Sequence, residues 1–213
     1  MRNGRALENR TTRRIRLISV ATALAVAFTV GLPQSADADR VTPPPAPANI
    51  QVPAGNRAYL EGHAEGTQNY ICLASGSGFA WAFFGPQATL FNEDARQVIT
   101  HFLSPNPFES GTPRATWQHS RDTSAVWALA IASSSDSAFV APGAIPWLLL
   151  QVVGALAGPT GGDRLTATTF IQRLNTFGGM APSTGCAMAT DVGKKALVPY
   201  AADYIFYKER ARD

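Results

Sequence analysis

Short apolar runs separated by turn-forming residues dominate the chain from residue 57 onward. Many runs are rich in aromatic and β-branched residues, and some alternate between apolar and polar positions, as residues 169–174 do. Alternation with a period of two is typical of strands that bury one face. The pattern predicts strands at residues 58–63, 69–74, 79–84, 88–91, 97–102, 115–119, 125–132, 148–153, 167–174 and 204–207.

The predicted strands are short and follow one another closely, with Gly, Pro, Asn and Ser between them. Turns are expected at Gly66, at residues 75–78, at Gly85-Pro86, and at residues 92–94, 104–107 and 159–162. Only residues 92–98 and 148–157 are candidates for short helices. The sequence therefore predicts an all-β, mainly antiparallel domain, a sandwich or barrel of about 8–10 strands.

The first 38 residues have the pattern of an export signal. An arginine-rich segment precedes the apolar run 17–32, which is short of the roughly 20 residues that span a bilayer. Small residues at Ala36 and Ala38 predict cleavage between Ala38 and Asp39. We expect a secreted, extracellular protein without stable membrane insertion after cleavage, with an uncleaved anchor as the alternative. The general and twin-arginine export routes both remain open.

Cleavage defines the organisation and the charge of the remaining chain. Residues 39–56 are proline-rich and are predicted to be extended, either as a tether to the envelope or lying along the domain. Residues 57–213 would form the globular domain. Removal of residues 1–38 takes six of 18 basic and two of 15 acidic residues, leaving 12 basic and 13 acidic residues. This balance gives no reason to expect nucleic-acid binding.

The chain contains two cysteines, Cys72 and Cys186. In an oxidising compartment, one pair predicts one disulfide. A redox-active pair is the alternative, but it would normally have Cys-x-x-Cys spacing.

Several sequence blocks together resemble the domain of unknown function 3455 family of secreted bacterial and fungal proteins, over about residues 50–207. The blocks include residues 66–72 (GTQNYIC), 86–90 (PQATL), 145–150 (IPWLLL), 170–176 (FIQRLNT) and 199–207 (PYAADYIFY). The resemblance implies an exported β-rich domain with paired cysteines and no established activity. The family has an Asp-Gly-Ser turn where this chain has Asp122-Thr123-Ser124, which puts the turn geometry in doubt.

The sequence contains few candidates for catalytic or metal-binding residues. His101 could act as a general base with Asp122 or Glu61. His63, His101 and His119 could bind a metal only if the fold gathers them, because their spacing matches no ligand motif. No cofactor is expected.

Arg173 shares a strand face with Ile171, and an inward arginine would need a carboxylate partner, for which Asp203 is the candidate. The tryptophans and tyrosines could line a carbohydrate or lipid groove, although core packing explains most of them.

Three functional hypotheses remain. The first is a protein that binds a ligand, a surface polymer or another cell-surface component. The second is a secreted hydrolase-like enzyme that uses His101 and a nearby carboxylate. The third is a purely structural envelope component.

Overall fold

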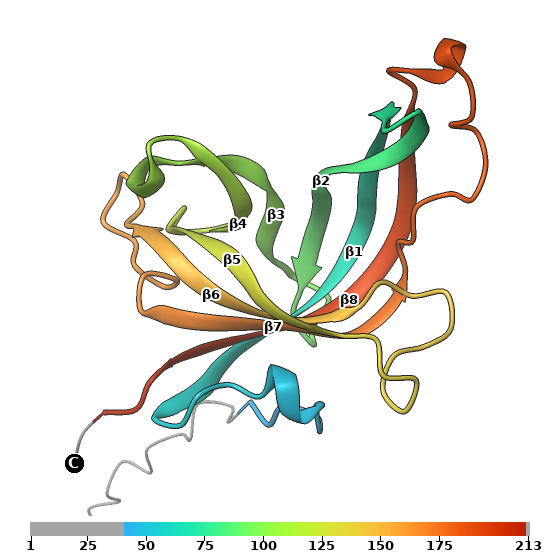
Figure 1. Cartoon of the computed structure of the whole chain (residues 1–213). Helices are drawn as coiled ribbons and strands as arrows, with labels where there is room; N and C mark the ends of the chain where they lie inside the picture. The colour runs from blue at the N-terminus through green and yellow to red at the C-terminus, as the bar shows by residue number, and fades with distance from the viewer. Residues whose placement is uncertain (1–40, 212–213) are drawn as a thin grey trace, which may run out of the picture. The chain divides into compact units, whose positions relative to one another are not determined.

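Eight antiparallel strands close into a barrel in the order β1 to β8, as the computed structural model shows for residues 41–211 (Figure 1). The predicted signal peptide and its cleavage site, Ala38 and Asp39, lie outside these described residues. The strands are β1 (Asn56–Ser75), β2 (Gly78–Phe91), β3 (Gln97–Asn106), β4 (Thr112–His119), β5 (Ala125–Ser134), β6 (Trp147–Leu156), β7 (Thr168–Gly178) and β8 (Lys195–Glu209). Three short 3-10 turns accompany them: η1 (Ala48–Ile50), η2 (Pro107–Glu109) and η3 (Ala189–Asp191).

The architecture confirms the all-β prediction and identifies it as a barrel. Each strand pairs with its neighbours along the chain, and β1 pairs with β8 to close the ring, with His63 opposite Asp203. Closure leaves no unpaired edge strand in the barrel. Among residues 41–211, no helix is long and apolar enough to cross a membrane.

Two expected turns lie inside strands, so the predicted strands 58–63 and 69–74 merge into β1, and 79–84 and 88–91 merge into β2. A Cβ atom on Gly66 would lie 2.1 Å from the Gln87 carbonyl oxygen, so this glycine permits close strand approach rather than a turn. Gly85 has φ +130° at a register shift, where Phe84 is the extra residue of a β-bulge. The turn expected at residues 104–107 is also displaced, because β3 continues to Asn106.

The two helix predictions are wrong for the described chain. Residues 148–157 fall mostly in β6, whose continuous apolar run arises because both faces are covered: Leu150 packs inside the barrel and Leu149 against the outer segment. Residues 92–98 form a turn followed by the start of β3. A run that is apolar on both faces cannot be assigned to helix or strand by periodicity alone.

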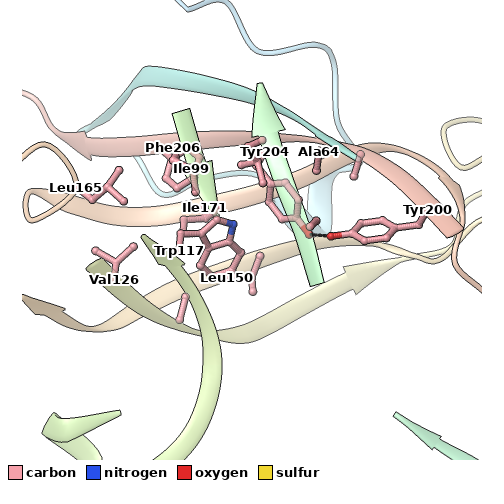
Figure 2. Close-up of a cluster of buried hydrophobic side chains, with 14 of the residues drawn as sticks. Ala64, Ile99, Trp117, Val126, Leu150, Leu165, Ile171, Tyr200, Tyr204 and Phe206 are labelled. Carbon is pink, nitrogen blue, oxygen red and sulfur yellow. Dashed lines mark hydrogen bonds between the residues drawn. The ribbon is translucent and has the colours of Figure 1, made fainter. Parts of the chain in front are cut away.

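One end of the barrel is filled by a hydrophobic cluster (Figure 2). Large side chains at its centre, including Trp117, Tyr204 and Phe206, are at most 1% exposed. Aromatic residues of this size bury roughly 150–250 Å² each, which makes them the main source of hydrophobic stabilisation here. The tryptophan and the tyrosines of this cluster, Trp117, Tyr200 and Tyr204, are therefore core residues, as predicted.

A second cluster lies outside the barrel, where the proline-rich segment covers β6, β7 and β8. Ile50 is fully buried against this face, together with Trp147 and Leu174. The buried Gln172 side chain donates a hydrogen bond from Nε2 to the Ile50 carbonyl at 2.7 Å. Of the two interpretations of this segment, the structure supports the one in which it lies along the domain.

The predicted disulfide is present between Cys72 and Cys186, whose Cα atoms are 5.5 Å apart. It joins the distal part of β1 to the long connection between β7 and β8. Cys72 is completely buried. The bond anchors this connection together with hydrogen bonds from Gly193 to the Cys72 carbonyl and from Trp81 to the Thr184 carbonyl.

Candidate functional site

A partly enclosed pocket of about 400 Å³ occupies the barrel interior next to the buried cluster. All eight strands contribute to its wall, so it lies in the lumen of the barrel. Its lining comprises Gln68, Phe83, Pro86, His101, Leu103, Pro113, Arg114, Ala115, Trp117, Ala128, Leu129, Ala130, Leu148, Leu150, Arg173 and Tyr204.

Most of the pocket wall is apolar. Phe83, Leu103 and Leu129 are 40–56% exposed, so they lie where the pocket meets solvent. Leu150 and Trp117 are buried and form deeper parts of the wall. A small number of polar groups on apolar walls is the usual composition of a small-molecule site.

His101 lies in the wall as a buried, neutral imidazole. Its Nδ1 atom is 2.9 Å from the Thr116 carbonyl oxygen. Because a carbonyl can only accept, Nδ1 carries the proton and donates it, which leaves Nε2 as an acceptor. Burial lowers the pKa of His101 to about 3, with a smaller contribution from the positive charge of Arg173, although the Thr116 hydrogen bond opposes the shift. A group with this pKa is too weak a base for general-base catalysis near neutral pH.

Two further polar side chains in the wall are buried with an unused hydrogen-bond donor. Gln68 is 3% exposed and Trp117 is fully buried. Neither Gln68 Nε2 nor Trp117 Nε1 has a hydrogen-bond partner within residues 41–211. Leaving a buried donor unpaired costs roughly 1–3 kcal/mol. Both nitrogens lie just behind the pocket surface, so an acceptor would reach them only after a small shift of the wall.

Arg173 lies on the same face of β7 as Ile171, as predicted, and this face is the barrel interior, but the predicted partner Asp203 is wrong. No carboxylate in the described part of the chain forms an ion pair with Arg173. Its Nη2 atom donates to the Pro146 carbonyl at 2.7 Å, and its buried Nε atom has no partner there. Asp203 faces the outside of β8 and accepts from His63 and Asn175.

The charge of Arg173 lowers the pKa of tyrosine hydroxyls near the pocket, against the effect of burial. Burial raises the pKa of Tyr204, and the charge of Arg173 partly offsets that rise. Tyr70 shows the same balance between burial and Arg173. The Tyr200 and Tyr204 hydroxyls are 3.3 Å apart, a contact drawn in Figure 2. These hydroxyls stay protonated at neutral pH, so Arg173 has no anionic tyrosine as a counter-ion.

A second arginine in the lining, Arg114, differs from Arg173 in being paired. Its Nε and Nη2 atoms donate to the two carboxylate oxygens of Glu109 at 2.8 and 2.7 Å. This bidentate pair leaves Arg173 as the uncompensated cation in the lining.

Asp122 lies with His119 rather than with His101. Asp122 Oδ1 is 3.0 Å from His119 Nδ1 and accepts from the Ser124 hydroxyl, while Oδ2 accepts from the Arg164 backbone N–H. Burial opposes ionisation, but these hydrogen bonds lower the pKa of Asp122 to about 2. The carboxylate thus ties the β4–β5 turn to the segment before β7, and the predicted pairing of His101 with Asp122 or Glu61 is not found.

The three histidines do not form a common site. His63 faces outward on β1, His101 lies in the barrel wall, and His119 ends β4. A different group, Glu61, His63 and Asp203, places its potential ligand atoms within 4.8 Å of one another on the outside of β1 and β8. His63 Nδ1 is 2.7 Å from Asp203, and Nε2 is 3.2 Å from Glu93. These ion pairs account for the closeness of His63 and Asp203, with Glu61 beside them.

Sequence reasoning missed Gln68 as a site residue and considered Trp117 only as one of many aromatics. Gln68 is two residues after Gly66 in a segment that looked like a turn. Its inward position follows from the alternation of β1 once that strand is known to be continuous, because Ala64 packs inside the barrel.

The family model described as "Protein of unknown function (DUF3455)" matches residues 53–208. No curated protein and no solved structure matches the chain.

Proposed function

The chain belongs to the DUF3455 family, whose description assigns no activity, and we propose from the barrel geometry that it is a binding protein for one small, largely apolar molecule. The observation that carries the proposal is the lumen pocket of about 400 Å³, lined from all eight strands.

Two physical arguments support this function. The interior of an eight-stranded barrel is just wide enough to be filled by side chains or to hold one small ligand. Here the aromatic cluster fills one part of the interior, and the pocket leaves a neighbouring part open. Its volume lies within the roughly 300–1,000 Å³ of typical ligand sites.

A neutral apolar fluorophore tests the proposal directly. We expect N-phenyl-1-naphthylamine to bind the purified domain at one site with an increase in fluorescence. Ala130, exposed at the pocket, offers a blocking variant: Ala130→Phe should narrow the entrance and weaken binding at least tenfold.

The matched control is Ala80→Phe, which adds the same ring at an exposed β2 position outside the pocket lining. This variant should bind like the wild type. Absence of binding to the wild type would overturn the proposed function, and equal binding by Ala130→Phe and the wild type would place the probe elsewhere.

We also infer that the protein acts outside the cytoplasm, as a secreted or envelope-associated protein. The Cys72–Cys186 disulfide supports this inference, because disulfides persist in oxidising compartments. Sequencing the amino terminus of protein recovered from the culture medium or the envelope should find Asp39 as the first residue. Recovery of the full-length chain from the cytoplasm alone would contradict export.

A further inference from the structure

We propose that the lumen pocket selects a small organic anion, a carboxylate on an apolar chain, with its head group at Arg173. The inference rests on the proposed function and adds the chemical class of the ligand.

Among the residues that the structure describes, the guanidinium of Arg173 has no anionic partner. A guanidinium that is partly withdrawn from water and has no anionic partner pays a desolvation cost without the compensating attraction of an ion pair. Arg173 is in this situation within residues 41–211, because the groups it contacts, the Pro146 carbonyl and the Tyr204 hydroxyl, are both neutral. An anion in the pocket would supply the missing charge.

The position of Arg173 is fixed by the fold rather than by a flexible loop. It lies on β7 opposite Leu148 of β6 and Tyr204 of β8. The hydrogen bond to Pro146 holds one end of the guanidinium, while the buried Nε atom remains unused. A cation held in this way is preorganised for an acceptor.

Two other side chains of the pocket lining also have a hydrogen-bond donor that is unpaired within residues 41–211. Gln68 Nε2 and Trp117 Nε1 are buried donors without partners and belong to the same pocket lining. Among the described residues, the remaining buried unpartnered side-chain atom, Trp147 Nε1, belongs to the outer cluster. The lining therefore combines one cation and two buried donors with no unpaired carboxylate, and the acceptor it contains, His101 Nε2, is neutral, which favours an anionic ligand head.

The rest of the pocket defines the ligand body. Leu148, Leu150 and Leu129 provide apolar walls suited to an alkyl or aryl group. One uncompensated cation matches one negative charge, which fits a carboxylate better than a phosphate dianion. A cationic ligand would be repelled by Arg173, and a neutral alcohol would leave its charge uncompensated.

Competition among three ligands that differ only in the head group tests the inference. Decanoate, decanol and decylammonium are each titrated against N-phenyl-1-naphthylamine bound to the wild-type domain at neutral pH, and the loss of fluorescence gives their affinities. We expect decanoate to bind at least about tenfold more tightly than decanol, as expected for a charge-assisted hydrogen bond, and decylammonium to bind most weakly.

Arg173→Gln should bring the decanoate affinity down to that of decanol while retaining decanol binding. Arg173→Lys should preserve part of the preference, because it keeps the charge but loses the planar fork. Arg96→Gln is the matched control: it removes the same charge at an exposed position outside the pocket lining and should retain the preference for decanoate.

The outcomes separate the two proposals. If the fluorophore binds but decanoate and decanol compete equally with the wild type, the anion inference is overturned and the proposed function stands. Retention of the full preference by Arg173→Gln would also overturn it. If neither the fluorophore nor any decyl ligand binds, the proposed function itself fails. Fluorophore binding by each variant verifies that its barrel is folded.

Discussion

The imidazole of His101 stacks on the indole of Trp117, with ring centroids 4.2 Å apart and planes inclined by 12°. The two residues face each other across the β3–β4 ladder, and Tyr204 of β8 meets both rings edge-on. This packing excludes water from the imidazole and explains why its neutral form is favoured.

His101 should therefore remain neutral far below the pH at which a free histidine titrates. We expect its NMR ring signals to stay unchanged from pH 8 to pH 5, since burial lowers its pKa to about 3. Below pH 6.5 this imidazole becomes protonated in the unfolded chain but stays neutral in the native state. His101 therefore lowers the free energy of unfolding progressively as the pH falls toward 3. A midpoint near pH 6.5 for His101 would contradict the buried position.

His63 should titrate in the opposite direction. Its hydrogen bond to Asp203 raises its pKa above the usual 6.5, aided by Glu93, although partial burial opposes the shift. The stabilisation is complete below pH 6.5 and is lost as the pH rises through the native pKa. We expect His63→Gln to lose less than about 1 kcal/mol at pH 6, because the pair is partly exposed.

The test for His63 is chemical denaturation of the wild type and His63→Gln at pH 6 and pH 9. The stability difference between them should shrink at the higher pH. A difference that grows with pH would show that protonated His63 does not stabilise the fold.

Loss of the disulfide should reduce stability substantially. Cys72 and Cys186 are 114 residues apart in sequence, and a cross-link over such a loop is worth about 2–5 kcal/mol. Cys186→Ala leaves Cys72 as a buried thiol, so the variant loses the bond without adding a buried polar group. Chemical denaturation should show this loss.

The control for the cross-link is the double variant Cys72→Ala and Cys186→Ala, which should add only the cost of a small cavity. Unreduced wild-type protein should also weigh two mass units less than the reduced form. Equal masses, or an unfolding midpoint that is insensitive to reductant, would exclude the bond.

Thr123 should be a site where glycine stabilises the protein. This β-branched residue has φ +58°, a left-handed conformation that costs an L-residue roughly 1–2 kcal/mol. Thr123→Gly should raise the unfolding free energy by about 0.5–1 kcal/mol, after the lost Thr123 hydroxyl contact with the Asp122 carbonyl is included.

Thr123→Ala separates the backbone effect from the side-chain contact, because it removes the hydroxyl but keeps Cβ. It should gain less than Thr123→Gly in the same thermal unfolding measurement. Destabilisation by glycine would show that the hydroxyl contact outweighs the backbone strain. The turn at Asp122-Thr123-Ser124, doubted from the sequence, therefore forms with threonine in a left-handed conformation.

Alternation located the strand at residues 167–174 well, whereas the predicted strand 204–207 covered only part of β8 (Lys195–Glu209). The sequence prediction failed at Gly66 and Gly85, because local turn preference cannot distinguish a chain reversal from a close approach or a bulge within a long strand. Both positions depend on contacts between β1, β2 and their neighbours.

The site was harder to predict than the fold. Alternation correctly placed Arg173 on the face of Ile171, which the structure shows to be the inner one, but Asp203 is next to the inward Tyr204 on β8 and therefore faces outward, where it meets His63. The donors of Gln68 and Trp117 are unpaired because no acceptor of the described barrel lies in position to hydrogen-bond with them. A sequence pattern cannot show which acceptors surround a side chain. Pairing of His119 with Asp122 was likewise hidden, although the two residues are only three positions apart.

The pairing of β1 with β8 has a kinetic consequence. His63 meets Asp203 across the closing ladder, so the final registration brings together residues separated by 140 positions. Such non-local contacts are slow to form. Until β8 arrives, β1 and β7 each present an unsatisfied backbone flank that can recruit another chain. A nascent or carboxyl-terminally truncated polypeptide is thus the aggregation-prone species, and completion of the ring is the step that removes the hazard.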